Sequence, residues 1–267
     1  MRQGHAGEYA LLNTLFGHDD LNIGYYKEED TKIDKARELM LLRILRLVPK
    51  IAKKTKFLVV GSGWGTAAMT IVDTYLCRVD SISTSTEEQE HLDKALKKKE
   101  YEKKLYTYLS EKHVDLPTET DNYNVLLSQE IMSYVEDKRK LFIVYHASLM
   151  AEGRLVMTDF LRGKKFDDKY AGLFGHTEDN PLWTELDVEK LTNKSGLQKV
   201  YNKDFSPELI GHYNYIISEL GAKEKAVDKK LGKGTAKKHL DIYKTKVEAL
   251  EKGAIQWSLY VYQKINI

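Results

Sequence analysis

The chain has 267 residues, of which 42% are apolar and 31% are charged, a balance typical of a globular protein. Its 42 Lys and Arg nearly cancel 40 Asp and Glu, so the net charge of +2 gives no overall field that attracts nucleic acid or anionic lipid. The single cysteine, Cys77, excludes an internal disulfide, and no stretch approaches the ~20 apolar residues of a membrane span. We therefore expect a cytoplasmic protein with no nucleic-acid partner and no integral membrane association.

The first predicted elements form the opening of a βαβ unit. Residues 32–53 carry apolar side chains at helical spacing and predict an amphipathic helix. Residues 57–60 are all apolar, as in a parallel strand that is buried on both faces, and a glycine-rich turn follows them. Residues 66–75 again have helical spacing. Strand, glycine turn and helix in this order are the start of a parallel sheet.

Further predicted strands alternate with helices along most of the chain. The strands cover residues 77–83, 106–109, 124–128, 154–160, 197–202 and 255–262. Helices are predicted at 86–104 and 137–150, and about 45 mostly helical residues separate the last two strands. This alternation predicts an α/β fold with a doubly wound, mainly parallel, seven-stranded, Rossmann-like sheet.

The alternation is interrupted after residue 160. Residues 161–192 contain Gly163, Gly172, Gly175 and Pro181 and have no clear strand pattern. Ligands of open α/β sheets bind beyond the carboxyl ends of the strands. We therefore expect this segment to be a helical lid insertion over that edge.

The glycine-rich turn is the first candidate binding site. Its sequence, Gly61-Ser62-Gly63-Trp64-Gly65, lacks the Gly-Lys-Ser/Thr ending of a phosphate-binding P-loop, and its spacing differs from the Gly-x-Gly-x-x-Gly of dinucleotide sites. Glycines let the backbone approach a ligand where a Cβ atom would clash. The loop therefore favours a ligand without phosphates, and the alternative is a tight turn that binds nothing.

Together with two other segments, this loop resembles the class I S-adenosylmethionine-dependent methyltransferases. The segments are residues 79–89 and 153–160, and the similar proteins include cyclopropane-fatty-acid synthases and the tocopherol, phosphoethanolamine and sarcosine/dimethylglycine methyltransferases. Matches at 9–26 and 253–264 extend the resemblance over nearly the whole chain in the same order. It implies S-adenosyl-L-methionine as cofactor and a small molecule as methyl acceptor.

The resemblance also implies a layout and a set of cofactor contacts. We expect a covering segment at 1–30, a cofactor-binding core at 31–160, the lid at 161–195, and strands and helices at 196–267 that complete the core and the acceptor pocket. The glycine loop would line the methionine part, Ser83 would lie near the ribose and Gln89 near the adenosyl group. Tyr9, together with Tyr25 or Tyr26, would fold over the cofactor. Ser128 would lie beside the transferable methyl group.

Two positions depart from the pattern of the similar proteins. Where those proteins place an Asp that binds adenine, this chain has Lys112, and Asp115 is the nearby substitute. Where many of them carry a His, this chain has Tyr134, and a phenol with a pKa near 10 is a poor base at neutral pH. The candidate bases are therefore His176, in the expected lid, and Glu130.

Three classes of function are compatible with these residues. The first is methyl transfer to a small molecule with a nitrogen, oxygen or carbon nucleophile. The second is a protein that retains the cofactor site and catalyses another reaction, such as a cyclisation, and the third is a binding protein with the same fold. No metal is expected, because the chain has one Cys, scattered His and no His-x-x-x-His pair. The sequence leaves the acceptor and the oligomeric state open.

Overall fold

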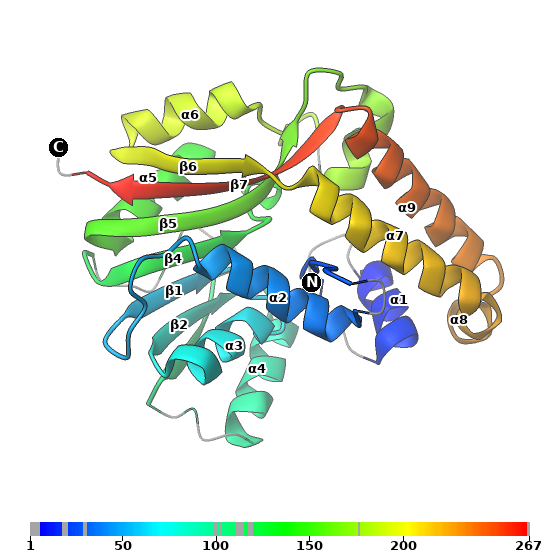
Figure 1. Cartoon of the computed structure of the whole chain (residues 1–267), viewed down its shortest axis with the longest axis horizontal. Coiled ribbons are helices and arrows are strands. Elements are labelled where there is room, and N and C mark those ends of the chain that lie inside the picture. Colours follow the sequence, from blue (N-terminus) through cyan, green and yellow to red (C-terminus); the bar gives the residue numbers. More distant parts are fainter. Residues whose placement is uncertain are drawn as a thin grey trace.

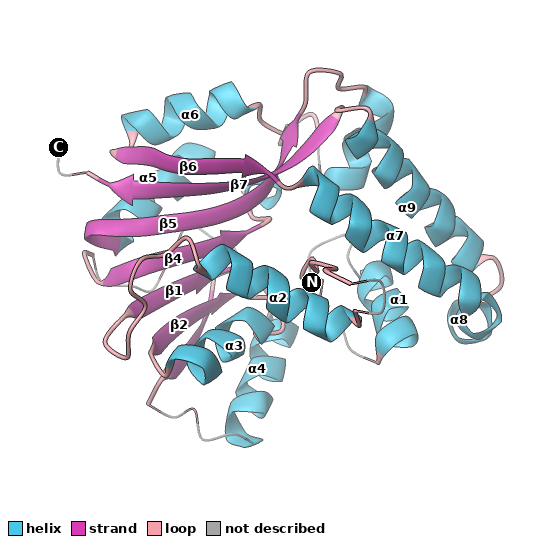
Figure 2. Ribbon diagram, in the orientation of Figure 1, coloured by secondary structure: helices cyan, strands magenta, loops and turns pink. Residues whose placement is uncertain are grey.

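A computed structural model describes residues 6–17, 21–28, 31–98, 101, 103–110, 115–116, 120–175 and 177–265. One seven-stranded sheet forms its centre, with the strand order β3-β2-β1-β4-β5-β7-β6 (Figures 1 and 2). The strands are β1 (Lys56–Val60), β2 (Arg78–Ser83), β3 (Leu105–Leu109), β4 (Tyr123–Gln129), β5 (Leu149–Arg162), β6 (Leu197–Asp204) and β7 (Ile255–Lys264). β7 is antiparallel to both of its neighbours, whereas the other pairs are parallel.

Helices cover both faces of the sheet. They are α1 (Ala6–Phe16), α2 (Ile33–Leu45), α3 (Thr66–Tyr75), α4 (Thr86–Lys98), α5 (Lys138–Ser148), α6 (Glu185–Lys194), α7 (Ser206–Ala222), α8 (Glu224–Leu231) and α9 (Thr235–Glu251), with short 3-10 segments η1 (Met132–Tyr134) and η2 (Asp168–Phe174). β1 lies in the middle of the parallel part of the sheet, between β2 and β4.

The apolar strand β1 explains why two cores form. Successive strand side chains point to opposite faces. Phe57 and Val59 accordingly pack with α2 and α3 in the first core, while Leu58 and Val60 pack with α5 and α6 in the second. All four are almost fully buried. Burial of a Val, Leu or Phe side chain contributes roughly 1.5–3 kcal/mol, so this strand anchors both layers.

The helices α1, α7, α8 and α9 lie beyond the carboxyl ends of the parallel strands, on the right of Figure 1. α7 and α9 pack along each other, and α1 contacts α8. Leu209 and Ile216 of α7 and Tyr243 of α9 belong to the first core, which continues from the sheet into this helical layer. These helices account for the long helical stretch expected between the last two strands.

The seven-stranded, mainly parallel sheet expected from the sequence is confirmed. The first predicted helix is shorter than expected: α2 ends at Leu45, because Pro49 has no N–H to donate to the Leu45 carbonyl and disfavours helical backbone at Val48. The segment expected to be a lid contains η2 and α6, and these two helices lie in different parts of the structure. α6 packs on the sheet through Val188 and Leu191, which belong to the second core.

Among the described residues, no helix is long and apolar enough to cross a membrane.

Candidate functional site

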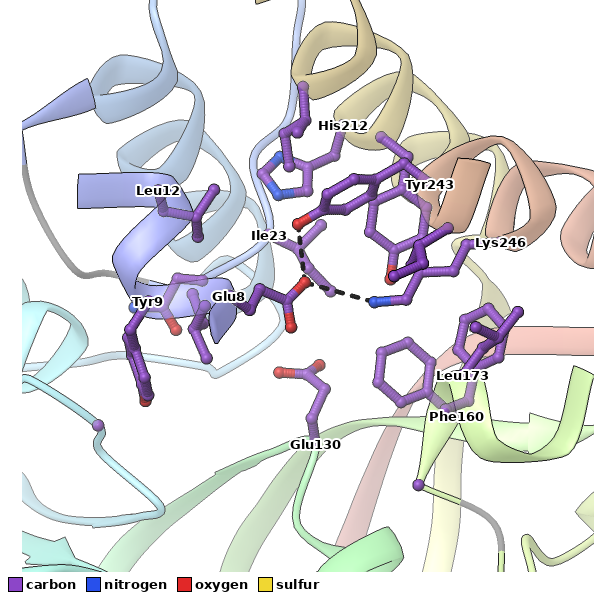
Figure 3. A pocket seen from close by; sticks show the side chains of 18 of the residues that line it. Glu8, Tyr9, Leu12, Ile23, Glu130, Phe160, Leu173, His212, Tyr243 and Lys246 are labelled. Atoms are coloured by element: carbon purple, nitrogen blue, oxygen red, sulfur yellow. Dashed lines mark hydrogen bonds and ion pairs between the residues drawn. The ribbon is translucent and has the colours of Figure 1, made fainter. Parts of the chain in front are cut away.

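A cavity of about 440 Å³ lies between the carboxyl ends of the parallel strands and the helical layer. One wall consists of residues 61–64 after β1, residues 129–130 at the end of β4, and Phe160 of β5. The opposite wall consists of side chains from α1, α7 and α9, and residues 172–175 close one side (Figure 3). This is the edge at which α/β sheets bind their ligands.

The glycine loop has a backbone that only glycine adopts without strain. Gly61, Gly63 and Gly65 have φ angles of +72°, +52° and +84°. The amides of Gly61 and Ser62 both donate to the carbonyl of Ile82, at 3.1 Å each, which ties the loop to the end of β2. A Cβ atom at Gly63 would meet no atom within 4 Å, whereas one at Gly65 would overlap Leu92. Gly63 therefore faces open space and Gly65 serves the packing of α4.

Unpartnered hydroxyl groups lie at the ends of β2 and β3. Ser83 and Ser110 are buried, and the Oγ atom of each has no hydrogen-bond partner among the described residues. The amide of Ser110 donates to the carbonyl of Ser83, so the two residues are adjacent. A buried polar group without a partner costs about 1–3 kcal/mol. Both hydroxyls can therefore bind a polar group of a ligand, although neither serine is among the residues that line the cavity.

Glu88 is a buried carboxylate beside this wall that the sequence analysis did not single out. Its Oε2 accepts from the amide and the hydroxyl of Thr84, both at 3.0 Å, and its Oε1 accepts from the hydroxyl of Tyr9 at 3.3 Å. Tyr9 also packs edge-on against Trp64, with ring centroids 5.7 Å apart. Ser85 Oγ accepts from the amide of Glu88, so the Ser-x-x-Glu capping spacing was a signal that could have identified it.

The expected contact Gln89 has other partners. Its side-chain amide donates to Asp93 at 3.1 Å and to Thr107 at 2.6 Å. It is not among the residues that line the cavity. Of the two adjacent residues on α4, Glu88 is therefore the one whose side chain contacts a lining residue.

Glu130 projects into the cavity from the end of β4. It is one of few non-glycine residues with positive φ, +51°, a conformation that costs of order 1 kcal/mol or more and that clusters at functional sites. Its Oε1 accepts from Thr158 Oγ1 at 2.8 Å and from Trp257 Nε1 at 2.9 Å. These two donors, from β5 and β7, fix the direction of the carboxylate.

Asp159 holds the backbone that follows Glu130. Its Oδ2 accepts from the amides of Ile131 and Met132, at 3.0 and 2.8 Å. Complete burial raises the pKa of this carboxyl group to about 6, against the opposing effect of those backbone donors. The left-handed turn at Glu130 thus depends on a carboxylate in the neighbouring strand.

The opposite wall contains a cation, a carboxylate and several tyrosines. Lys246 of α9 forms an ion pair of 3.3 Å with Glu8 of α1, and the hydroxyl of Tyr243 donates to the same Glu8 oxygen at 2.7 Å (Figure 3). The carboxylates of Glu8 and Glu130 point toward each other in this view. Tyr213 is buried beside them, and burial raises the pKa of its phenol well above the ordinary value.

His212 of α7 also lines the cavity. Its Nδ1 accepts from the backbone amide of Gly24 at 3.3 Å, so the proton of the neutral ring is on Nε2. The hydroxyl of Tyr26 lies 3.2 Å from the same Nδ1. Burial lowers the pKa of His212 to about 3, and the ring is therefore neutral at physiological pH.

The other expected site residues are dispersed. Ser128 Oγ pairs with the hydroxyl of Tyr145 at 2.8 Å, away from the cavity lining, and Tyr25 lies under the guanidinium of Arg43. Asp115 is exposed and forms an ion pair of 2.9 Å with Lys140. Lys112 and the candidate base His176 lie outside the described residues. Tyr9, Gly61, Ser62, Gly63, Trp64 and Glu130 are the expected residues that the fold brings together in the lining.

No group of three or more His, Cys, Asp or Glu side chains with metal-binding geometry occurs among the residues that the structure describes. The polar side chains of the cavity lining are carboxylates, phenols, lysines, histidines, two carboxamides and the hydroxyl of Ser62.

Three similar proteins support the same fold. A Halorhodospira halochloris protein named sarcosine/dimethylglycine N-methyltransferase is 20% identical over 265 residues, which is 96% of this chain and 91% of the relative. Phosphoethanolamine N-methyltransferase 2 of Haemonchus contortus superposes with a TM-score of 0.83 at 14% identity, over 99% of this chain and 59% of that one. The cyclopropane synthase MmaA2 of Mycobacterium tuberculosis superposes with a TM-score of 0.78 at 12% identity, over 96% of this chain and 94% of that one.

These likenesses confirm the methyltransferase fold that the sequence predicted. The family described as mycolic acid cyclopropane synthetase matches residues 20–172, which is more than half of the chain. The chain therefore belongs to the mycolic acid cyclopropane synthetase family.

Proposed function

We propose that this protein is an S-adenosyl-L-methionine-dependent methyltransferase that acts on the amine nitrogen of a small molecule. The observation that carries the proposal is one cavity that joins the open glycine loop at Gly63 to the fixed carboxylate of Glu130. Two of the three similar proteins reported above are named N-methyltransferases, and these names support a nitrogen acceptor.

When bound, S-adenosyl-L-methionine supplies an electrophilic methyl group on a sulfonium sulfur. Residues 61–65 would hold its methionine part, and the unpartnered hydroxyls of Ser83 and Ser110 would meet polar groups of the adenosine. The carboxylate of Glu88 is the nearby acceptor that suits ribose hydroxyls, and Tyr9, which now donates to it, would close over that side. The roles of Ser128, Gln89 and Asp115 toward the cofactor stay predictions.

The residues of the chain contribute positioning and exclusion of water. α1, the segment 168–175 and the helices α7 and α9 cover the carboxyl edge of the sheet, so that the acceptor would react away from bulk solvent. Holding two reacting groups in line can account for roughly 7–11 kcal/mol of the barrier in favourable cases. A covered cavity with few, fixed polar groups is suited to this kind of catalysis.

Glu130 would orient the acceptor. Its carboxylate is held by Thr158 and Trp257, so it can accept from an amine N–H or stabilise the positive charge that develops on nitrogen. A neutral amine already has a lone pair and needs no enzymatic base, whereas a hydroxyl or carbon acceptor needs one. His176 and Glu130 stay the predicted bases for a hydroxyl or carbon acceptor.

A cytoplasmic location of the protein also stays a prediction.

Methyl-labelled S-adenosyl-L-methionine tests the proposal directly. The purified protein is incubated with the labelled compound and a panel of small amines, alcohols and alkenes, and products are identified by mass spectrometry and NMR. We expect label on nitrogen and one S-adenosylhomocysteine for each product. Label on oxygen or carbon would contradict the nitrogen acceptor, and an unlabelled product formed without S-adenosylhomocysteine would indicate a different reaction, such as a cyclisation.

A further inference from the structure

The segment 130–135 follows β4 and carries two side chains of the cavity lining, Glu130 and Tyr134. It begins with the left-handed backbone of Glu130 and continues into the short 3-10 segment η1. Such irregular backbone leaves amide and carbonyl groups that need partners on other elements. The positions of both lining side chains therefore depend on the groups that hold this segment.

Asp159 of β5 holds the first amides of the segment. Its Oδ2 accepts from the amides of Ile131 and Met132, and its Oδ1 accepts from the amide of Phe160 at 2.9 Å. Asp159 is 1% exposed, and a buried carboxylate is costly unless donors surround it. Burial raises its pKa to about 6, so the group is ionised at pH 7.5 and three backbone amides compensate its negative charge.

Lys138 of α5 holds the other end of the segment. Its Nζ donates to the carbonyl of Val135 at 3.1 Å and to Oδ1 of Asn180, whose side-chain amide donates to the carbonyl of Ser133 at 2.7 Å. Lys138 is 3% exposed, and burial lowers the pKa of its ammonium group while the negative charge of Asp159 raises it. The segment thus lies between a buried anion and a buried cation that both bind its backbone.

We propose that Asp159 and Lys138 are positioning residues for the acceptor, which hold residues 130–135 so that the carboxylate of Glu130 keeps its direction in the cavity (Figure 3). The inference rests on the proposed function and adds two residues that act on methyl transfer through Glu130. Neither Asp159 nor Lys138 is among the residues that line the cavity, so neither is placed to touch the acceptor. Buried charges often add little net stability, whereas contacts that fix one backbone conformation can align a reacting group.

The left-handed turn explains why these contacts matter. A non-glycine residue with positive φ costs of order 1 kcal/mol or more, so Glu130 keeps its φ of +51° only while other contacts outweigh this strain. Without the acceptor oxygens of Asp159, relaxation of φ would swing the carboxylate away from Trp257 Nε1, which donates to it at 2.9 Å. A misplacement of about 1 Å can lower a rate about 10²-fold.

The indole N–H of Trp257 reports the position of the Glu130 carboxylate without any ligand. The chain has three tryptophans, so ¹⁵N-labelled protein gives three indole signals, and Trp64→Phe and Trp183→Phe identify the other two. A hydrogen bond to a carboxylate is stronger than one to a neutral group, and it moves the proton signal downfield. We expect the Trp257 signal to move upfield in Asp159→Asn, as in Glu130→Gln, and farther in Asp159→Ala.

Asp80→Asn is the matched control for the loss of a buried carboxylate. Asp80 of β2 is also 1% exposed, and it accepts from the hydroxyl of Tyr123 at the start of β4, the end that lies away from the cavity. We expect the Trp257 signal to stay in place in this variant. A signal that is equally unmoved in folded Asp159→Asn would overturn the proposal.

Lys138→Met tests the other end of the segment, because Met has a similar length but donates no hydrogen bond. Asn180→Ala, which removes the contact between Lys138 and the segment through Asn180, replaces it if the first variant does not fold. We expect the Trp257 signal to move in the same direction as in Asp159→Asn, and to stay in place in Arg139→Gln, a change at the exposed neighbour of Lys138. An unmoved signal in the folded variants would overturn the assignment of Lys138.

A double-mutant cycle separates positioning from a general loss of structure. At saturating S-adenosyl-L-methionine, kcat is measured for the amine that the unaltered protein methylates, with Asp159→Asn, Glu130→Gln and the double variant. We expect Asp159→Asn to lower kcat at least about tenfold by itself but less than about twofold in the Glu130→Gln background, because residues that act as a unit are not additive. Independent effects of the two substitutions in the double variant would overturn the proposal.

Failure of this inference is distinguishable from failure of the proposed function. The indole signal is measured in the free protein and needs neither cofactor nor acceptor. Methyl transfer to nitrogen together with an unmoved signal in Asp159→Asn contradicts the positioning role alone. A moved signal in a protein that transfers no methyl group to nitrogen contradicts the proposed function.

Discussion

The two walls of the cavity are built in different ways. In the sheet-side wall, the glycine loop is one short segment, residues 61–65, whose backbone angles depend on glycine and whose position depends on the ends of two adjacent strands. The helical wall brings together Glu8 of α1, His212 of α7, and Tyr243 and Lys246 of α9, and these three helices are separate in the chain. A local backbone motif can be recognised in a sequence, whereas a wall assembled from three separate helices cannot. Substitutions on each wall should therefore have different consequences.

The largest effect is expected at Glu130, which projects into the cavity from the end of β4. Glu130→Gln keeps an oxygen that accepts from Thr158 and Trp257 but removes the charge that faces the amine. We expect kcat/KM to fall roughly 10²–10³-fold, with the affinity for S-adenosyl-L-methionine unchanged, as measured by steady-state kinetics and calorimetry. A normal rate in this variant and in His176→Ala would mean that proximity alone suffices.

The next effect concerns the glycine-loop wall. Gly63→Ala places a methyl group in the open space that the cofactor would occupy, and we expect its affinity for S-adenosyl-L-methionine to fall about 100-fold or more, since a clash with the ligand adds to any strain. Gly253→Ala is the matched control, because Gly253 also has positive φ and open space around its missing Cβ but lies outside the cavity lining. An unaltered affinity in folded Gly63→Ala would remove the loop from the cofactor site.

The helical wall should show a dependence on pH. Burial lowers the pKa of His212 to about 3 from an ordinary value of 6.5, so its contribution to stability is present above pH 6.5 and is lost as the pH falls toward 3. Between pH 7.5 and pH 5 this amounts to about 2 kcal/mol of unfolding free energy. His212→Asn keeps an acceptor for Gly24 but cannot be protonated in this range.

Urea denaturation at the two pH values measures this difference. The loss of stability at pH 5 should be smaller in His212→Asn than in the unaltered protein by about that amount. The same loss in both proteins would show that another group causes it.

The smallest effect is expected from a single hydroxyl. Ser83→Ala should weaken binding of S-adenosyl-L-methionine by about 0.5–1.5 kcal/mol, since the Oγ atom of Ser83 has no described protein partner and would meet the ligand. Ser195→Ala is the comparison, because Ser195 lies outside the cavity lining and its Oγ donates to the carbonyl of Leu191, so its loss should affect stability rather than affinity. Equal affinities for Ser83→Ala and the unaltered protein would place the ribose contact elsewhere, with Glu88 the next residue to test.

Predictions from the sequence were most accurate where the signal was local. The apolar run of β1 and the glycines after it predicted a buried parallel strand and a close backbone turn, and both are present. A sequence is least informative about the directions in which neighbouring side chains point. The helical rotation between adjacent residues directs Gln89 to Asp93 and Glu88 to Tyr9, and the expected contact of Gln89 with the adenosyl group stays a prediction.

The sequence by itself determined the α/β sheet and the glycine loop, because hydrophobic periodicity and close backbone approach leave marks on consecutive residues. The methyltransferase family came from the resemblance of these segments to known proteins. Only the tertiary structure decided which charges meet across the cavity. The pairing of Glu8 with Lys246, and the fixing of Glu130 by Trp257, join residues more than 120 positions apart. Such pairings depend on where helices and strands pack, and packing is set by the two cores rather than by the residues that form the site.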